Sequence, residues 1–305
     1  MQQKIIELLA KRLTVSVEVF PPRNGHSPDI ITGKIARLRE LKPDFVSITK
    51  GACGSMRGGT IPIGYMIADH YKMNPLVHFR SRDHSKREVE NLLVDHMYFG
   101  IQNMLAVMGD PVKGEPACKP NPRTHNRFAS DLVKQITDMN KGRYLPLPGE
   151  KESCRDGIES DFCVGVACYP EREHAEEKMV MRAKTAAGAE FAITQMFFEP
   201  QLYIDYVKRM RDIGIRIPII AGIRPVTKPE HVEAAEKVFG AKVPFSLKQA
   251  IKGSSPAQAR AKCIDYTIGL CREISEAGAP GVHLFILNDV ELAEDIVDRI
   301  REAVS

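Results

Sequence analysis

Eight short runs rich in β-branched residues recur along the chain, and segments with helical periodicity lie between them. The runs are VSVEVF (15–20), FVSIT (45–49), PLVHF (75–79), NMLAVM (103–108), CVGVACY (163–169), FAITQ (191–195), IPIIAGI (217–223) and GVHLFIL (281–287). Eight strands, each followed by a helix, are typical of a closed barrel of parallel strands. We therefore predict a single (β/α)₈ TIM barrel over residues 1–305. A doubly wound open sheet is the alternative, although its first strand usually ends in a Gly-rich phosphate turn and here that turn is PPRNG.

The segments between the runs indicate helices and two loops. Several of the predicted helices end in Gly, the usual residue of a left-handed helix exit. The predicted helices include 29–41, 85–100, 174–188, 199–214, 229–240 and 255–278, and all of these except the first end in Gly. Residues 111–126 and 140–160 are rich in Pro, Gly and charge and are predicted to be loops. The first 13 residues, MQQKIIELLAKRL, have charges inside their apolar pattern, which indicates an amphipathic helix and not a signal peptide.

Composition excludes several classes of protein. The 305 residues are 43% hydrophobic and 27% charged, as in a soluble globular protein. The net charge of +4 is spread along the chain without a long Lys/Arg block, so we expect no nucleic-acid partner. No segment is long and apolar enough to cross a membrane, and we expect a cytoplasmic protein. The seven cysteines form no CxxC pair or Cys/His cluster, so we predict neither a metal site nor a disulfide framework.

Polar residues lie at or just past the ends of the predicted strands. Active sites of such barrels are built at the carboxyl ends of the strands and on the loops that follow. Any one polar residue there could instead cap the next helix, but seven positions together favour a site. The seven positions are Glu18, Thr49, His78, Gly109-Asp110, Tyr169, Gln195 and Asn288.

Glu18 interrupts the apolar run VSVEVF. Side chains alternate between the two faces of a strand, so the three valines share one face and Ser16, Glu18 and Phe20 share the other. The valine face suits the layer against the helices, which directs Glu18 into the barrel mouth. A buried carboxylate is costly unless it is paired. From the residues alone, a structural ion pair with an interior Lys or Arg therefore remains open beside a catalytic role.

Eight motifs, in order along nearly the whole chain, resemble those of the methylenetetrahydrofolate reductase family. They are VSVEVFPPR, LKPDFVSITKGA, MGDP, FASDLV, ACYPE, KTAAGAEFAITQMFF, IPIIAGIRPV and LFILN. The resemblance implies a (β/α)₈ barrel that carries FAD as a flavoprotein of one-carbon metabolism and methionine biosynthesis. It implies reduction of 5,10-methylenetetrahydrofolate to 5-methyltetrahydrofolate by hydride transfer from reduced FAD.

The resemblance also implies roles for individual residues. Glu18 matches the general acid that protonates the leaving nitrogen as the methylene bridge opens to an iminium. Asp110 matches an aspartate near the flavin and the pterin, where negative charge favours the cationic folate intermediate. Gln195 matches the amide that hydrogen-bonds the pterin edge. Flavin-binding positions of the family correspond to Thr49, His78, Val107, Met108, Gly109, Asp110, Phe128, Ala129, Ala167, Tyr169 and Lys184, the last of which would meet a phosphate.

Some positions depart from the family pattern. His174 is displaced by one position from a histidine of the family motif. Ala235 stands where well-known members have an aromatic residue that stacks on folate or nicotinamide. Asp289 stands where an arginine would bind the glutamate tail of folate, so another cation, Arg224 or Lys228, would have to serve.

These departures leave alternatives open. The electron donor is either NAD(P)H or a redox partner protein, and the direction of the reaction is open. One alternative is a non-redox folate-binding or assembly subunit of a one-carbon enzyme complex, which the joint presence of Glu18, Asp110 and Gln195 argues against. Another is a flavin-free, NAD(P)H-dependent variant. We expect a folate substrate and a homo-oligomer.

Overall fold

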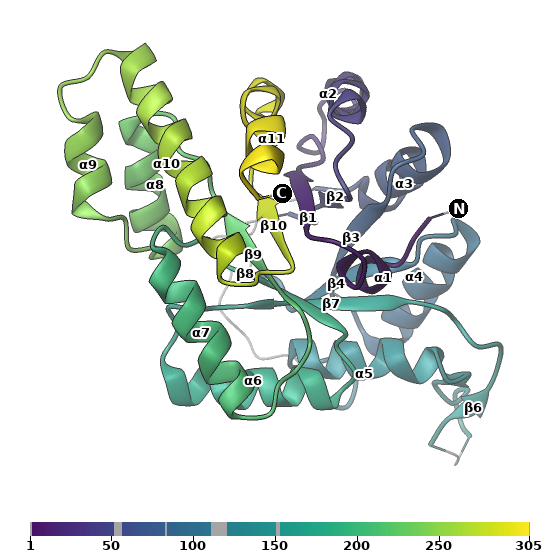
Figure 1. The fold of residues 1–305 in the computed structure, drawn as a ribbon. Coiled ribbons are helices and arrows are strands. Elements are labelled where there is room, and N and C mark those ends of the chain that lie inside the picture. The colour runs from purple at the N-terminus through teal and green to yellow at the C-terminus, as the bar shows by residue number, and fades with distance from the viewer. Residues whose placement is uncertain (1, 52–56, 83, 111–120, 151–152, 305) are drawn as a thin grey trace.

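The barrel is closed by eight parallel strands in the order β1-β10-β9-β8-β7-β4-β3-β2 (Figure 1). The computed structural model describes residues 2–51, 57–82, 84–110, 121–150 and 153–304. The predicted (β/α)₈ TIM barrel is confirmed, and the alternative of an open sheet is wrong. Each predicted run contains one strand. The strands are β1 (Thr14–Val19), β2 (Val46–Ile48), β3 (Pro75–Arg80), β4 (Asn103–Val107), β7 (Cys163–Cys168), β8 (Phe191–Thr194), β9 (Ile219–Ile223) and β10 (Gly281–Leu284).

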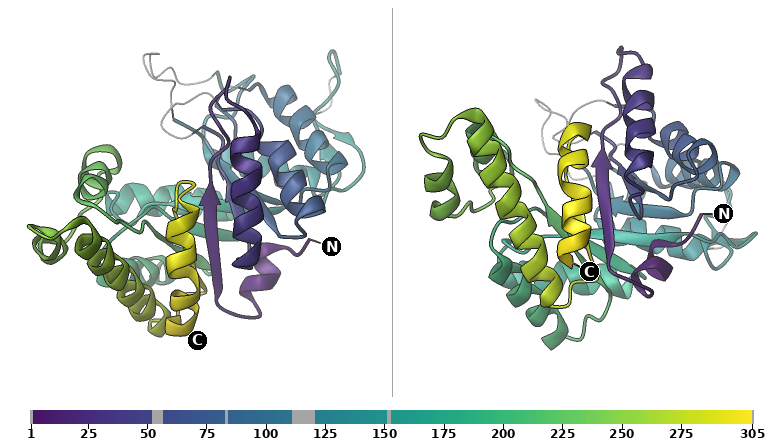
Figure 2. Two further views of the ribbon diagram at one scale, coloured as in Figure 1. Left: turned by 90° about the horizontal axis from the view of Figure 1, so that it is seen from above. Right: turned by 45° about the horizontal axis from the view of Figure 1, so that its top comes forward.

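Helices surround the barrel, and Figure 2 shows α2 and α11 on either side of β1. Helices α8, α9 and α10 pack together at one side of the barrel (Figure 1). All six predicted helical segments contain a helix. The helices are α1 (Ile5–Leu9), α2 (Asp29–Glu40), α3 (Thr60–Tyr65), the π-helix η2 (Met66–His70), α4 (Lys86–Tyr98), α5 (Ala129–Met139), α6 (His174–Ala186), α7 (Pro200–Asp212), α8 (Pro229–Phe239), α9 (Phe245–Ile251), α10 (Pro256–Glu276) and α11 (Val290–Val304).

Local signals in the sequence set the limits of several helices. At the start of α4, the Ser85 hydroxyl accepts a hydrogen bond from the Glu88 amide, and the Glu88 carboxylate accepts one from the Ser85 amide. This reciprocal capping satisfies two amide groups that have no partner inside the helix. At the other end of a helix, Gly240 adopts φ 66° and terminates α8. Glycine takes up this left-handed conformation without a steric penalty.

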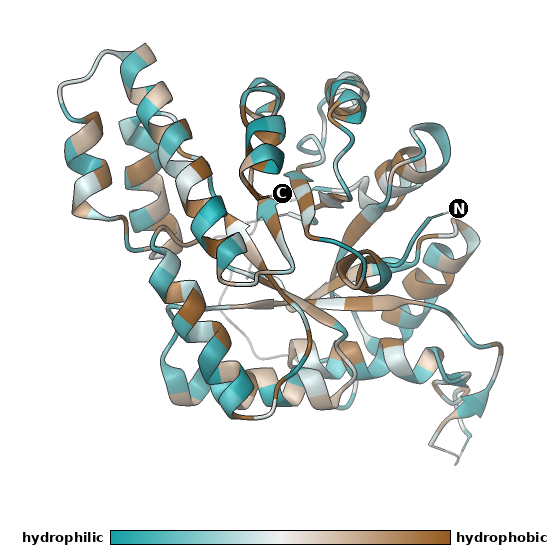
Figure 3. Cartoon of the chain, viewed as in Figure 1, coloured by the Kyte–Doolittle hydropathy of each residue, from teal (hydrophilic) through white to brown (hydrophobic). Residues whose placement is uncertain are grey.

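Alternation along the strands separates two packing layers. The three valines of β1 are buried in the large cluster between the barrel and its helices. Figure 3 shows the hydrophobic strands at the centre and hydrophilic residues on the outer faces of the helices. A smaller cluster fills the barrel interior, with Phe45, Leu76 and Phe191 among its members, and Ile5 of α1 joins it. The interior is therefore a packed core, and only the ends of the barrel have room for a ligand.

Three segments differ from the sequence prediction. Helix α1 covers five residues of the predicted 1–13, because the chain turns after Leu9 to enter β1. The predicted loop 140–160 contains a two-stranded antiparallel sheet of β5 (Arg143–Tyr144) and β6 (Arg155–Asp156). Strands of two residues carry no periodic pattern, so the sequence did not indicate them. Most of the predicted loop 111–126 lies outside the described residues.

No helix among the described residues is long and apolar enough to cross a membrane.

Candidate active site

The predicted site residues lie at the carboxyl end of the barrel, on two complementary arcs of its strands. Glu18 is in β1 and Gln195 directly follows β8, and the sheet order places only β10 and β9 between them. The residues predicted to bind flavin follow the other arc. They lie in or just after β2, β3, β4 and β7 and at the start of α5, and Lys184 is in the last turn of α6. The predicted substrate and cofactor residues therefore meet at one mouth.

Glu18 is buried, with 5% of its surface exposed. Its Oε2 atom accepts a hydrogen bond of 3.4 Å from the Ser47 hydroxyl. The same atom lies 3.5 Å from Nε2 of His78 and 3.9 Å from Nε2 of His283. Within the described ranges, no Lys or Arg nitrogen approaches Glu18 to within 4.0 Å. The structural ion pair that the sequence left open is therefore not formed by these residues.

The two histidines are held by hydroxyl groups. Nε2 of His78 lies 3.0 Å from Oγ of Ser47, and Nδ1 of His283 lies 2.8 Å from Oγ of Ser16. The pKa of His78 is lowered to about 4, first by burial, while the charge of Glu18 acts in the opposite direction. His78 is therefore a neutral imidazole near pH 7, and its contact with Glu18 is not an ion pair under those conditions.

Ser16, Ser47 and His283 were not among the predicted site residues. Each occupies an inward position of its strand, and Ser16 shares the inner face of β1 with Glu18. A polar residue at an inward position of a barrel strand is the signal that could have found them.

Asp110 follows β4 and is exposed at the mouth. Its charge reaches the Tyr169 hydroxyl, whose pKa is raised first by burial and further by Asp110. The preceding Gly109 adopts φ 89°, and a Cβ atom there would lie 2.1 Å from Cδ of Arg80. The positive φ and the Arg80 side chain packed against it both favour glycine at this turn.

Lys184 of α6 is buried, with 6% of its surface exposed. Its Nζ atom donates a 2.6 Å hydrogen bond to the carbonyl of Ala167 and lies 5.8 Å from the centre of the Tyr169 ring. Burial lowers the pKa of the Lys184 ammonium group. Lys184 is therefore not a solvated surface lysine, which was the ordinary expectation for a lysine on a helix.

The other predicted flavin-binding positions vary in exposure. Thr49 is buried, and its hydroxyl has no hydrogen-bond partner among the described residues. Phe128 is 59% exposed at the start of α5, and Arg127 lies 5.5 Å from the centre of its ring. Sδ of Met108 accepts a hydrogen bond of 3.7 Å from Ser81. Val107 and Ala129, at the end of β4 and the start of α5, are partly buried.

Two other strand-end residues are held by local hydrogen bonds. The Asn288 side chain accepts a 2.7 Å bond from the amide of Phe20 and donates a 2.9 Å bond to its carbonyl. Asn288 therefore joins the exit of β1 to the turn after β10, which is a structural role. The side-chain oxygen of Gln195 accepts from the amide of Met196 at 2.9 Å, an arrangement that leaves the amide nitrogen of Gln195 for other partners.

Two positions that depart from the family pattern lie away from the inner mouth. Ala235 is 2% exposed and belongs to the hydrophobic cluster that packs α8 against α9 and α10. An aromatic residue at Ala235 would therefore enter packed core. His174 is exposed as the first residue of α6.

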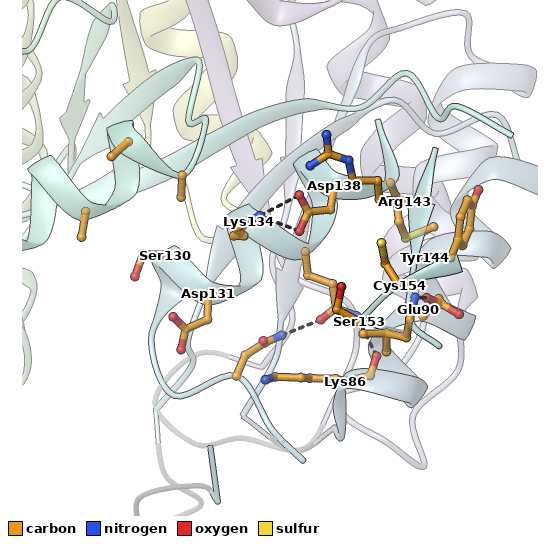
Figure 4. A pocket seen from close by; sticks show the side chains of 17 residues that line it. Lys86, Glu90, Ser130, Asp131, Lys134, Asp138, Arg143, Tyr144, Ser153 and Cys154 are labelled. Carbon is orange, nitrogen blue, oxygen red and sulfur yellow. Dashed lines mark hydrogen bonds and ion pairs between the residues drawn. The ribbon is translucent and has the colours of Figure 1, made fainter. Parts of the chain in front are cut away.

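A separate cavity of about 740 Å³ lies outside the barrel wall. Figure 4 shows side chains from α4, α5 and the β5–β6 hairpin around it, including Glu90, Lys134, Asp138 and Cys154. Two of these, Lys134 and Asp138, form an ion pair of 2.7 Å. None of the predicted site residues lines this cavity.

The part of the chain that the structure describes contains no group of three or more His, Cys, Asp or Glu side chains suited to a metal ion.

Comparison with known proteins gives one consistent family. The family profile "Methylenetetrahydrofolate reductase" matches residues 2–301. The 5,10-methylenetetrahydrofolate reductase of Escherichia coli is 28% identical over 292 residues, which cover 92% of this chain and 88% of that protein. Methylenetetrahydrofolate reductase 1 of Schizosaccharomyces pombe is 26% identical over 298 residues, which cover 95% of this chain but 46% of the yeast protein. The chain thus spans less than half the length of the yeast relative.

Among solved structures, similarity extends to an uncharacterized protein from Clostridium thermocellum that binds two copies of 5-methyl-5,6,7,8-tetrahydrofolic acid. Its TM-score is 0.61 at 16% sequence identity, and the match covers 96% of this chain and 98% of that chain. At this identity the match shows a common fold.

Proposed function

Because the chain belongs to the methylenetetrahydrofolate reductase family, we propose that it is an FAD-dependent oxidoreductase that interconverts 5,10-methylenetetrahydrofolate and 5-methyltetrahydrofolate. The observation that carries the proposal is the setting of Glu18, a buried carboxyl group at the barrel mouth with two imidazoles and a serine hydroxyl around it. Such a group suits proton transfer better than structural pairing. The similarly folded Clostridium thermocellum protein binds 5-methyltetrahydrofolic acid, which is the reduced form proposed here.

In the proposed reaction Glu18 supplies one proton. The bond between the methylene carbon and its leaving nitrogen breaks, and the electron pair left on that nitrogen takes the proton of the carboxyl group. The methylene carbon becomes part of an iminium ion, which a hydride reduces to a methyl group. In the reverse direction the Glu18 carboxylate accepts the proton as the ring closes.

Hydrogen bonds order the side chains around Glu18. The Ser16 hydroxyl is positioned to donate to the carbonyl of Val282 at 3.2 Å, and its Oγ lies 2.8 Å from Nδ1 of His283. Nε2 of His283 lies 3.9 Å from Oε2 of Glu18 and has no hydrogen-bond partner among the described residues. These contacts fix the neighbours of the proposed proton donor.

The residues on the arc formed by β2, β3, β4 and β7 fit FAD. The buried Thr49 hydroxyl has no partner among the described residues and is free to bond a ligand. Lys184 is proposed to meet a phosphate, because an ammonium group has three donors and the bond to Ala167 uses one. Asp110 would lie between the two ligands and favour the cationic folate intermediate. FAD, when bound, supplies the hydride.

We propose NAD(P)H or a redox partner protein as the source of electrons.

The decisive measurement is the visible spectrum of the purified protein under anaerobic conditions while 5-methyltetrahydrofolate is added. Flavin absorption that bleaches on addition is the expected result. A protein with folate affinity but no flavin would favour the non-redox subunit or the flavin-free variant, and a protein with neither would refute the proposal.

A further inference from the structure

Two cationic residues and a histidine follow β9 at the mouth of the barrel. Arg224, Lys228 and His231 lie on the segment from the end of β9 to the first turn of α8, and we call this group the β9 rim. In the sheet, β9 neighbours β10, and β10 neighbours β1 with Glu18. The β9 rim is therefore on the arc that also holds Gln195 and Glu18.

The Arg224 side chain is fixed across two strands. It is partly buried, and its Nη1 atom donates a 2.6 Å hydrogen bond to the carbonyl of Phe285, just after β10. This is its one hydrogen bond within the described part of the chain, and a guanidinium group has five N–H donors. Arg224 thus holds a positive charge at the mouth with donors left for a ligand.

The charges of two acidic residues, Asp289 and Glu18, act on the Arg224 guanidinium. Burial lowers the pKa of Arg224, while the charges of Asp289 and Glu18 both raise it. Glu18 is in the inner mouth, and Asp289 is on the turn after β10, where its Oδ1 accepts from the amide of Leu292 at 3.0 Å. The strand order β1-β10-β9 places Arg224 on the same arc of the mouth as Glu18.

Lys228 extends the positive charge outward. Lys228 is exposed and precedes α8, whose first amide groups receive no side-chain cap among the described residues. The positive end of a helix favours anions. His231 is held by a 3.2 Å contact between Nδ1 and Oγ of Thr227. Burial and the charges of Arg224 and Lys228 lower the pKa of His231, so His231 adds no positive charge near pH 7. The rim presents two cations beside two carboxylates, those of Asp289 and Glu230.

We propose that the β9 rim binds the carboxylates of the folate glutamate tail, with Arg224 as the principal contact and Asp289 as an opposing charge that limits affinity. This inference rests on the proposed function. A folate whose pterin ring lies between Glu18 and Gln195 would extend its anionic end outward from the same arc, and Arg224 is a partly buried cation on that arc. Guanidinium groups match carboxylates in geometry and charge.

The test compares ligands with and without the tail by isothermal titration calorimetry on the holoenzyme. The ligands are a tetrahydropterin that lacks the tail, monoglutamyl 5-methyltetrahydrofolate and its triglutamyl form. Arg224→Leu should weaken binding of both folates by roughly 10-fold or more, as expected for a lost charged hydrogen bond, and leave the tail-less pterin unchanged. Arg224→Lys should retain most of the affinity that the tail contributes.

Asp289→Asn is a second variant, and it should change the affinity for folate in the opposite direction. Asparagine keeps the oxygen that caps Leu292 and removes the negative charge, so folate binding should tighten by about 1.5- to 5-fold, and more for the triglutamyl form. Arg216→Leu is the matched control, because Arg216 is an exposed arginine just before β9, at the opposite end of the barrel.

The outcomes separate the inference from the proposed function. If the wild-type protein binds the tail-less pterin as tightly as the folates, or if Arg224→Leu weakens all three ligands equally, the β9 rim is not the tail site and the proposed function stands. If the wild-type protein binds none of the three, both the function and the inference fail.

Discussion

Oε2 of Glu18 and Nε2 of His78 lie 3.5 Å apart at the barrel mouth, yet the histidine is neutral near pH 7 because burial lowers its pKa to about 4. No Lys or Arg nitrogen of the described residues lies within 4.0 Å of Glu18, so its close neighbours are imidazoles and a serine hydroxyl. This setting supports the proposed role of Glu18 as the proton donor.

Glu18→Gln tests the proton transfer directly. Glutamine has nearly the same shape but cannot donate a carboxyl proton, so the folate half-reaction should slow by about 10²- to 10⁴-fold. Reduction of the flavin by its electron donor should change little. Anaerobic stopped-flow measurement of the two half-reactions checks this, and an equal loss in both would assign Glu18 a structural role.

The stability of the protein should depend on pH through His78. Its folded pKa of about 4 lies below the ordinary value of 6.5, so the unfolded chain binds the proton more readily. The contribution of His78 is therefore fully present above about pH 6.5 and is lost progressively as the pH falls toward 4. The difference between the two pKa values corresponds to roughly 3 kcal/mol.

Urea unfolding of the apoprotein at several pH values measures this dependence. His78→Gln should flatten the fall in the free energy of unfolding between pH 6.5 and 4. His174→Gln, which changes an exposed histidine, should leave the slope as in the wild type. An unchanged slope in the His78 variant would mean that His78 is already accessible to protons in the folded protein.

Lys184→Met should weaken the binding of FAD. The variant removes the one buried ammonium group on α6 among the described residues, and methionine preserves most of the side-chain volume. Loss of a charged hydrogen bond to phosphate should raise the dissociation constant by about 10-fold. Fluorescence titration of the apoprotein with FAD measures it. Arg182→Met, at an exposed position of the same helix, is the control, and equal effects in the two variants would argue against a phosphate contact.

Two glycine substitutions should change stability in opposite directions. A Cβ atom on Gly165 would lie 2.3 Å from Cζ of Phe191 inside the barrel, so Gly165→Ala should destabilise the fold by about 1–3 kcal/mol. Gly33 is exposed in α2 with no atom within 4 Å of such a Cβ, and Gly33→Ala should stabilise the fold by about 0.5–1 kcal/mol. Urea unfolding of both variants checks the signs, and a stable Gly165 variant would show that the interior can repack.

The strands and the direction of the Glu18 side chain could be predicted because both depend on the pattern of residues within a few positions of the chain. A strand that packs against helices on its outer face needs apolar side chains at alternate positions, as the three valines of β1 do. Because active sites of such barrels lie at the carboxyl ends of the strands, Glu18, Asp110 and Gln195 were predicted to lie at one mouth. The β5–β6 hairpin escaped prediction because two-residue strands are stabilised by pairing with each other and not by a repeated pattern.

The partners of Glu18 depended on contacts between distant segments. Ser16 and His283 are separated by 267 positions in the chain and meet because β10 closes the barrel against β1, in a register that pairs these two residues. The pairing of β1 with β2 places Ser47 beside Glu18 in the same way.

By itself, the sequence determined which segments form strands, which faces they bury and that a carboxyl group points into the mouth, since these follow from periodicity within a few residues. Only the tertiary structure decided that imidazoles and a serine surround that carboxyl group, that Lys184 is buried and that Asn288 is structural. These properties depend on strand register and barrel closure, which set the distances between residues far apart in the chain.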